Sequence, residues 1–300
     1  ATQAQQSFTV SKANQATVNI AEVTSSAAYT GSAYTATPTL SSTGGSGNGS
    51  VTYAIVSGGT AQGCTLTSGT LTATSVGTCL IAATKASDTN YLAGTSGNLT
   101  FTFTVKTQTI TFTTPADITF GATPASLSAT STSTLTVAFT SATTNVCTVS
   151  GTTVTILTSG TCTINADQAG DSNYSAATQV SKSFVVAKAT PVLSSLSNAT
   201  KNYGDSAFTI TDPSITGSIP GTFTYTSATT AVATVSGASV TPAAVGTSVI
   251  TALFTPTDTG KYNTSTVTMT LTVAQRTLAQ PNAPNATATA GVLKSFAVTW

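Results

Sequence analysis

The chain has 300 residues and a formal net charge of +1; 6% of the residues are charged and 40% are hydrophobic. Nine scattered basic residues cannot neutralise a row of phosphates, so nucleic acid is excluded as a partner. Apolar and β-branched residues occur throughout, which favours a folded β protein over a disordered chain. No apolar run approaches the roughly 18 residues that cross a bilayer, so we expect no membrane span in this segment.

Residues 1–13 are predicted to be the last strand of a preceding repeat. Ser7-Phe8 and Lys12-Ala13 return as Ser183-Phe184 and Lys188-Ala189, at a constant offset of 176. The same residues lack the basic and apolar regions of a signal peptide. We therefore expect a chain that begins within a domain, either as a mature protein or as a window from a longer one.

Three complete repeats are predicted, at residues 14–106, 107–189 and 190–275. Residues 140–151 return with ten identities in twelve at residues 226–237, an offset of 86. An offset of 83 relates the cysteines and the Asp-x-Asn-Tyr sequence of the first repeat to those of the second. Repeats of this length suit separate seven-stranded sandwiches and not the short coils of a solenoid.

Threonine alternates with apolar residues through each repeat, most clearly in residues 267–273. This period of two is typical of strands with one buried face. Turn-forming pairs such as Ser150-Gly151 separate the strand-like runs, and no segment has helical spacing. The sequence therefore predicts an all-β protein of tandem immunoglobulin-like β-sandwich domains in an extended array.

Two segments, residues 143–166 and 229–252, share the sequence pattern TxxVxTVSGxxVTxxxxGTxxIxA. It resembles the bacterial immunoglobulin-like tandem repeats of large surface and adhesin proteins, and the resemblance covers residues 14–275. Residues 276–300 resemble a linker and the first strands of a fibronectin type III-like domain. The resemblance implies Greek-key sandwiches that act as spacers or adhesive modules, and it brings no catalytic residues.

Four cysteines form two pairs with the same separation of fifteen residues: Cys64 with Cys79, and Cys147 with Cys162. Because the same spacing recurs in both repeats, we expect each pair to form a disulfide. The third repeat has Ala233 and Ser248 at the equivalent positions, so both members of the pair are replaced together. Free buried thiols and a metal site are the alternatives, although the chain has no histidine and the spacing is not that of a zinc site. Disulfides imply an oxidising compartment, so we expect a secreted or cell-surface, extracellular protein.

An aspartate followed closely by a tyrosine recurs near the end of each repeat: Asp88 and Tyr91, Asp171 and Tyr174, Asp258 and Tyr262. We expect the aspartate to close an Asx turn before the last strand, and the tyrosine to cover the end of the core with its hydroxyl in water. Calcium is the alternative, but it requires six to eight oxygen ligands and the chain has eight acidic residues in all. No metal and no cofactor are therefore expected.

Three aromatic residues recur before the central hairpin of each repeat, at Tyr53, Phe139 and Tyr225. We interpret them as core residues, with stacking on a sugar as the alternative.

Catalysis is not expected, because a chain without histidine cannot assemble the usual serine or cysteine triads. The leading hypothesis is an extracellular spacer or stalk in a large bacterial surface adhesin, whose partners are neighbouring repeats. One alternative is a subunit of an extracellular filament or sheath, in which copies of the same chain associate through their nearly uncharged surfaces. The other is binding of a glycan or protein ligand by loops of the first repeat, which has a glycine-rich loop at residues 41–50.

Overall fold

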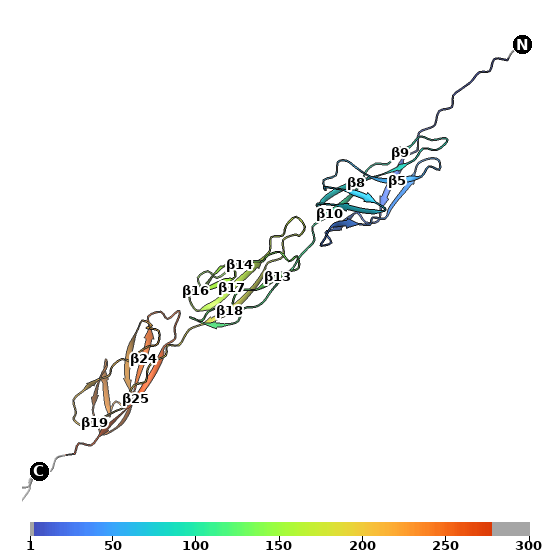
Figure 1. The fold of residues 1–300 in the computed structure, drawn as a ribbon. Coiled ribbons are helices and arrows are strands. Elements are labelled where there is room, and N and C mark those ends of the chain that lie inside the picture. Colours follow the sequence, from blue (N-terminus) through green and yellow to red (C-terminus); the bar gives the residue numbers. More distant parts are fainter. Residues whose placement is uncertain (1–2, 278–300) are drawn as a thin grey trace, which may run out of the picture. The chain divides into compact units, whose positions relative to one another are not determined.

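The computed structural model describes residues 3–277, which contain strands and turns and no helix (Figure 1). This part of the chain accordingly offers no apolar helix of the length that a bilayer requires. Two compact units are present, Ala1–Ala187 and Lys188–Trp300. The all-β fold class is confirmed, whereas the expected fibronectin type III-like strands lie outside the described residues.

The first repeat places its core between one large sheet and two smaller ones. Its strands are β1 Val18–Glu22, β2 Ser26–Ala28, β3 Tyr34–Ala36, β4 Leu40–Gly44, β5 Val51–Val56, β6 Thr65–Thr67, β7 Thr70–Ala73, β8 Gly77–Lys85, β9 Gly94–Thr95 and β10 Leu99–Thr104. The large sheet has the order β2-β10-β8-β5, with β9 paired to β8, and the smaller ones are β3-β7-β6 and β1-β4. Buried residues of β7, β8 and β10 form one hydrophobic cluster with Tyr34.

The second repeat has the same plan. Its strands are β11 Ile110–Phe112, β12 Ile118–Thr119, β13 Ala129–Ser131, β14 Ala138–Ser141, β15 Cys147–Ser150, β16 Thr153–Ile156, β17 Gly160–Asp167 and β18 Val180–Ala187. The large sheet has the order β12-β18-β17-β14, and the pairs β11-β13 and β15-β16 complete the sandwich around a second hydrophobic cluster.

The third repeat has two sheets. Its strands are β19 Ala199–Asn202, β20 Phe208–Thr209, β21 Gly221–Ser227, β22 Ala233–Ser236, β23 Ser239–Pro242, β24 Gly246–Pro256 and β25 Ser265–Ala274. The large sheet has the order β19-β25-β24-β21 and the small one β20-β23-β22. A third hydrophobic cluster, with Ile210, Val240, Ile250 and Leu271 among its buried members, lies between them.

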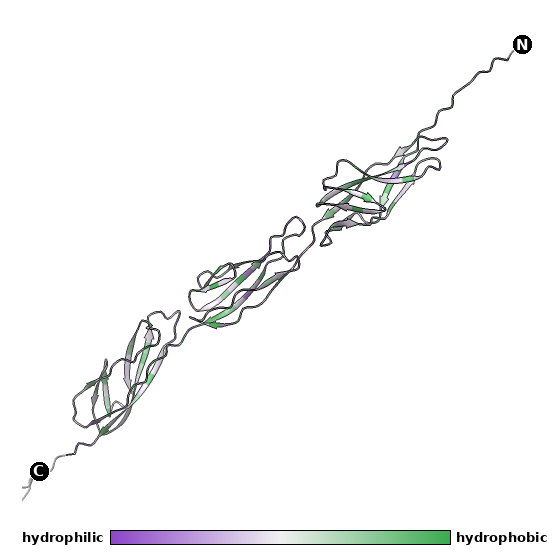
Figure 2. Cartoon of the chain, in the orientation of Figure 1, coloured by the Kyte–Doolittle hydropathy of each residue, from purple (hydrophilic) through white to green (hydrophobic). Residues whose placement is uncertain are grey.

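One inner strand of each large sheet, here called its central strand (β8, β17 or β24), contributes a row of buried side chains to the core. Apolar and polar residues alternate along the strands, as Figure 2 shows. The inward residues of the three central strands correspond position by position: Cys79, Ile81 and Ala83; Cys162, Ile164 and Ala166; Ser248, Ile250 and Ala252. All are fully buried except Ser248, which is 3% exposed. The alternation is therefore the main reason why these segments form strands with one buried face.

Each central strand begins at a glycine that cannot be replaced without strain. Gly77, Gly160 and Gly246 have φ values of 130°, 138° and 147°, a region that side chains disfavour. A Cβ atom on Gly160 would lie 3.2 Å from a methyl carbon of Val146, and one on Gly246 would lie 3.0 Å from Val232. The glycine thus lets the chain turn tightly into the central strand.

Disulfides join the two layers of the first and second repeats. Cys64 is bonded to Cys79 of β8, and Cys147 of β15 is bonded to Cys162 of β17, which confirms the pairing that the repeat period predicts. In the third repeat Ala233 is fully buried, and the Ser248 hydroxyl lies 2.8 Å from the Ser227 hydroxyl. The serine hydroxyl that replaces the Cys162 sulfur thus bonds to the neighbouring strand of its own sheet, β21.

Replacing Ala233 and Ser248 together by cysteine is expected to form a third disulfide, because the two positions correspond to Cys147 and Cys162. Closing a loop of this size contributes roughly 3 kcal/mol in the chain-entropy model, so the oxidised variant should unfold at higher temperature. Calorimetry under oxidising and reducing conditions measures the change, with Ala233→Cys alone as the control. Two titratable thiols in the oxidised double variant would contradict the correspondence.

Candidate functional site: the aspartate turns

Three aspartate turns (residues 88–91, 171–174 and 258–262) are the clearest recurring polar feature. In the first, Asp88 Oδ1 accepts hydrogen bonds from the backbone N–H groups of Asn90 at 2.8 Å and Tyr91 at 2.9 Å. The Asp88 N–H donates in return to the Tyr91 carbonyl at 3.1 Å. The carboxylate thereby fixes a short turn that no strand ladder stabilises.

The second and third turns repeat this geometry with one difference. Asp171 Oδ1 accepts from Asn173 at 2.8 Å and from Tyr174 at 2.9 Å. The third turn is one residue longer, and Asp258 forms an ion pair of 3.0 Å with Lys261. The side-chain bond from Lys261 is the largest of the causes that lower the pKa of Asp258.

Each turn binds the chain segment that leads into its own repeat. In the first unit, Ala13 donates to the Asn90 carbonyl at 2.9 Å and accepts from Leu92 at 2.8 Å. Lys106 makes the same two bonds with residues 173 and 175, at 2.8 and 3.0 Å. In the second unit, Ala189 makes them with residues 261 and 263, at 3.0 and 2.8 Å. The turns therefore fix where the chain enters each sandwich.

The glycine-rich loop of the first repeat packs on the first aspartate turn. Asn48 donates its backbone N–H to Asp88 Oδ2 at 2.9 Å. A Cβ atom on Gly47 would overlap the Asp88 carboxylate, and one on Gly49 would lie 2.0 Å from the Ala86 carbonyl oxygen. The glycines thus permit close packing against residues 86–88, which gives this loop a structural role beside the ligand-binding role that the sequence suggested.

Hydrogen bonds determine the protonation of Asp88. Bonds from the backbone of Asn90, Asn48 and Tyr91, in that order of size, lower the pKa of its carboxyl group. Since the carboxylate oxygens already accept backbone N–H groups, few lone pairs are left for a cation. Within residues 3–277, no three histidine, cysteine, aspartate or glutamate side chains gather where they could hold a metal ion.

Tyrosines connect the first two repeats within the first unit. The Tyr34 hydroxyl lies 2.9 Å from both the Ser172 carbonyl oxygen and Asn173 Oδ1. The ring of Tyr29 meets Tyr174 edge-on, with 5.6 Å between ring centroids. Tyr34 is only 2% exposed, so its hydroxyl is directed at the neighbouring repeat and not at water.

One of the three turn tyrosines packs on the repeat before its own. Tyr91, Tyr174 and Tyr262 are half-buried, and none belongs to the hydrophobic cluster of its own repeat. The ring of Tyr174 instead packs on Tyr29 of the preceding repeat.

Gln108 is a buried polar residue that the sequence analysis missed. It is 6% exposed, and its Nε2 donates to Gln168 Oε1 at 2.5 Å and to the Ser175 carbonyl at 2.7 Å. The Ser133 hydroxyl donates to Gln108 Oε1. This network joins the incoming segment to the residues around the second aspartate turn.

A sequence signal for this network exists. Gln15 and Gln108 each lie two residues after the bridging residue, Ala13 or Lys106, and Gln15 Oε1 accepts the Ser46 N–H at 2.6 Å. The third repeat has the buried Pro191 at this position. Aligning the repeats on the bridging residue would have revealed the two glutamines.

The recurring aromatics are positioned by their cross-strand partners. Tyr53, Phe139 and Tyr225 pack against the three hydrophobic clusters, and each lies opposite a fully buried alanine of the central strand. The Tyr225 hydroxyl donates to Asp212 Oδ1 at 2.6 Å. Burial and this carboxylate raise the pKa of Tyr225. A large residue opposite a small one fills the sandwich without overpacking.

No protein-family model matches the chain, and no curated protein matches it. Solved structures with similar architecture include Drosophila N-cadherin EC1-3 (TM-score 0.28, 13% identity, 77% of this chain and 91% of that one). A second is domains 1-6 of the surface layer protein SbsC, with a TM-score of 0.27 and 15% identity over 90% of this chain and 42% of that one. A third is the Sidekick-1 immunoglobulin domains 1-5, with a TM-score of 0.32 and 14% identity over 87% of this chain and 60% of that one. The strands and sheets themselves define this chain as a tandem immunoglobulin-like β-sandwich protein.

Asp88→Asn is expected to keep the turn but lose the contribution of the charge. Because the pKa of Asp88 is lowered by folding, that contribution is present above the ordinary value of about 3.9 and disappears as the pH falls through the lowered pKa. The melting temperature of the wild type should therefore exceed that of the variant at pH 5 to 7, and the two should converge near pH 2. A difference that stays constant over this range would contradict the assignment.

Tyr34→Phe is expected to weaken the contact between the first two repeats, because it removes the only hydroxyl that reaches Ser172 and Asn173 in the described contacts. Loss of a buried hydrogen bond costs about 1 kcal/mol. Chemical denaturation measures the change, and Tyr203→Phe, at a tyrosine that is 54% exposed, is the matched control. Equal effects of the two substitutions would show that the Tyr34 contact contributes nothing.

Proposed function

We propose that this chain is a spacer in an extracellular surface protein and that its repeats carry tension along the chain. The observation that supports this most directly is the pairing of the first and last strands of the large sheet. β2 pairs in parallel with β10, β12 with β18, and β19 with β25. The three repeats share this feature although their smaller sheets differ.

Parallel pairing of the terminal strands resists extension for a geometric reason. When the two ends of a repeat are pulled apart, two parallel neighbours slide past each other along their length. Their hydrogen bonds are then loaded together, whereas the bonds of an antiparallel hairpin would open one after another. A repeat of this design unfolds only when several bonds break at once.

Side chains lengthen this pairing in two repeats. Asp117 Oδ1 accepts the Val185 N–H at 2.6 Å beside β12, and Asn198 Oδ1 accepts the Thr270 N–H at 2.8 Å beside β19. In the first repeat a backbone carbonyl, that of Ser25, accepts from the last strand at 2.9 Å. Each repeat thus has an additional acceptor directly before its first large-sheet strand.

Chemistry and sequence support an extracellular location. The disulfides persist in oxidising environments and restrict how far the first two repeats can extend. The resemblance of residues 143–166 and 229–252 to bacterial immunoglobulin-like repeats points to the stalk of a large bacterial adhesin. The low charge and the hydroxyl-rich surface give the loops no distinctive ligand-binding chemistry, which favours a spacer over a binding module.

Stretching single molecules of the full chain tests the proposal. We expect three separate unfolding events, two of which release less chain because a disulfide encloses fifteen residues. Adding a reductant should lengthen those two releases by about 50 Å each, at roughly 3.4 Å per residue, and leave the third unchanged. Asn198→Ala should lower the unfolding force of the third repeat alone.

Two results would contradict the spacer role. Gradual extension without discrete events would mean that the parallel pairs do not resist force. If the third repeat unfolds at the force of an ordinary antiparallel hairpin, and Asn198→Ala leaves that force unchanged, the parallel pair of the third repeat does not resist force.

A further inference from the structure

A pocket lies at the joint between the first and second repeats, within the first unit. Its volume is about 360 Å³, inside the range of roughly 300–1,000 Å³ that is usual for ligand-binding pockets. Most of the residues that line it belong to the first repeat, among them Tyr29, Ser32, Tyr34 and Thr74, whereas Asn173 belongs to the second. Ligand sites occur preferentially at such interfaces between domains.

Hydrogen bonds hold the walls of the pocket in place. On the side of the first repeat, the backbone N–H and the hydroxyl of Thr30 both donate to the Ala33 carbonyl, at 3.2 and 2.8 Å, and close a tight turn. On the other side, Asn173 donates its backbone N–H to Asp171 Oδ1 at 2.8 Å, and its Oδ1 accepts the Tyr34 hydroxyl at 2.9 Å. A ligand would therefore find the pocket already formed, which reduces the entropy lost on binding.

Several polar groups of the pocket have no partner in the protein. Within residues 3–277, the hydroxyls of Tyr29, Ser32 and Thr74 form no hydrogen bond to another residue. The Nδ2 group of Asn173 has none either, because the bond from Tyr34 engages only Oδ1 of this side chain. Water ordinarily satisfies isolated surface hydroxyls, but these side chains line one hollow and come from two repeats. Together they offer several donors and acceptors to a ligand that itself carries several hydroxyls.

The ring of Tyr29 adds an apolar surface to the pocket. Its centroid lies 5.0 Å from that of Tyr34 and 5.6 Å from that of Tyr174, which meets it edge-on. Tyr34 is 2% exposed, so it supports the ring of Tyr29, which is half-buried and keeps an accessible part. The face of an aromatic ring carries partial negative charge and attracts polarised C–H groups.

The lining of the pocket carries no formal charge in the part of the chain that the structure describes. The two charged groups nearby are already engaged: Lys106 Nζ lies 3.5 Å from the Thr30 carbonyl oxygen, and the Asp171 carboxylate accepts two backbone N–H groups. The pocket therefore favours a neutral ligand over an ion. A sugar ring in the pyranose form is neutral, carries several hydroxyls and has an apolar face of C–H groups.

We propose that this pocket binds a neutral pyranose sugar, with one face of the sugar ring against Tyr29 and its hydroxyls bonded to the polar side chains around that ring. Because Asn173 belongs to the second repeat and the other polar groups to the first, the bound sugar bridges the joint and restricts the angle between the two repeats. This site goes beyond the spacer role and does not rest on it, since a spacer needs no ligand.

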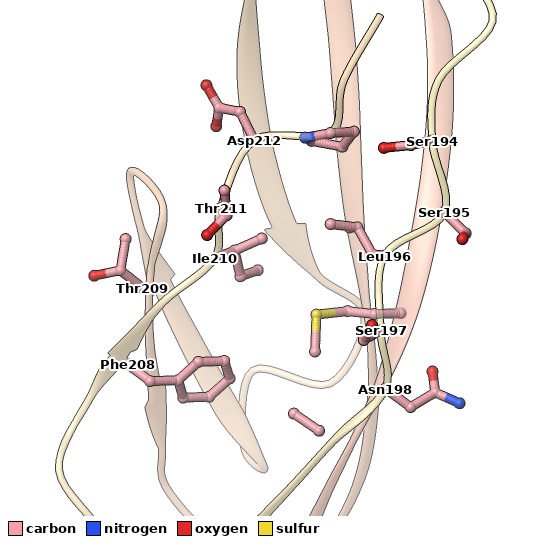
Figure 3. A pocket seen from close by; sticks show the side chains of 13 residues that line it. Ser194, Ser195, Leu196, Ser197, Asn198, Phe208, Thr209, Ile210, Thr211 and Asp212 are labelled. Atoms are coloured by element: carbon pink, nitrogen blue, oxygen red, sulfur yellow. The ribbon is translucent and has the colours of Figure 1, made fainter.

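A groove beside Leu196 in the third repeat fits a sugar less well, although its volume, about 460 Å³, is larger. Figure 3 shows its polar side chains Thr209 and Asp212 pointing away from Leu196. Its aromatic residue, Phe208, already has Lys201 Nζ 5.0 Å from the ring centroid. The groove thus does not combine an accessible aromatic ring with inward polar groups as the pocket at the joint does.

NMR titration of the full, isotope-labelled chain locates the site. The probes are the methyl glycosides of glucose, mannose, galactose and N-acetylglucosamine, which are neutral pyranoses with different arrangements of their polar groups. At least one probe should shift the amide signals of residues 29–34 and 172–174 together, because the site draws on both segments. The absence of shifts with every probe, or shifts confined to other residues, would overturn the proposal.

Single substitutions test the contacts, with the probe that gives the largest shifts. Thr74→Val keeps the shape of an exposed side chain and removes its hydroxyl, and Asn173→Asp keeps the acceptor for Tyr34 but removes the Nδ2 donor. Each should weaken binding by about threefold or more, as expected for a lost hydrogen bond. Thr270→Val, at an exposed threonine of the third repeat, is the matched control and should bind the probe as the wild type does.

The outcomes separate the sugar site from the bridge across the joint. Melting temperatures close to that of the wild type show that the variants are folded. Equal affinities of Thr74→Val and Thr270→Val would mean that the sugar does not occupy the pocket. Weaker binding by Thr74→Val but not by Asn173→Asp would place the sugar on the first repeat alone and refute the bridge.

Discussion

The alternation of side chains along the central strand of each large sheet is the constraint on which the rest of the structure depends. One face of this strand consists of a cysteine or serine, an isoleucine and an alanine at alternate positions, all buried. The alanine leaves room for the aromatic residue opposite it. The first position is a cysteine that joins the two layers in the first two repeats, and a serine that bonds within the large sheet in the third. Shifting the register by one residue would expose this whole set to water, so the strand fixes the pairing of both neighbours.

A second constraint operates at the ends of the sandwiches. An isolated sandwich does not need to control where its incoming segment lies, but a tandem array does, because that segment is the outgoing segment of the previous repeat. The aspartate turns supply this control through two backbone hydrogen bonds to a single residue, Ala13, Lys106 or Ala189. In the first turn, backbone N–H groups engage both oxygens of the Asp88 carboxylate.

Much of this arrangement could be predicted from the sequence, because period-two alternation reports directly which face of a strand is buried. The repeat period paired the cysteines, and the Asp-x-Asn-Tyr sequence indicated a turn. The partners of the turn tyrosines could not be predicted, because alternation does not identify neighbours from another repeat; Tyr174 packs on Tyr29 for this reason. The glycines of residues 41–50 are equally compatible with a flexible binding loop and with close packing, and only the position of Asp88 distinguishes the two.

The third repeat shows how one sandwich compensates for a missing covalent bond. Its β24 and β25 pair over nine residues, against seven for β17 and β18 and five for β8 and β10. Its parallel terminal pair, β19 with β25, covers four residues, against two for β12 with β18. These longer ladders add backbone hydrogen bonds to the large sheet of the repeat that has no disulfide. The additional pairing lies in the large sheet, however, and leaves the opposite edge short, where a single bridge and Pro213 stand in place of a ladder. A groove beside Leu196 lies next to this short edge.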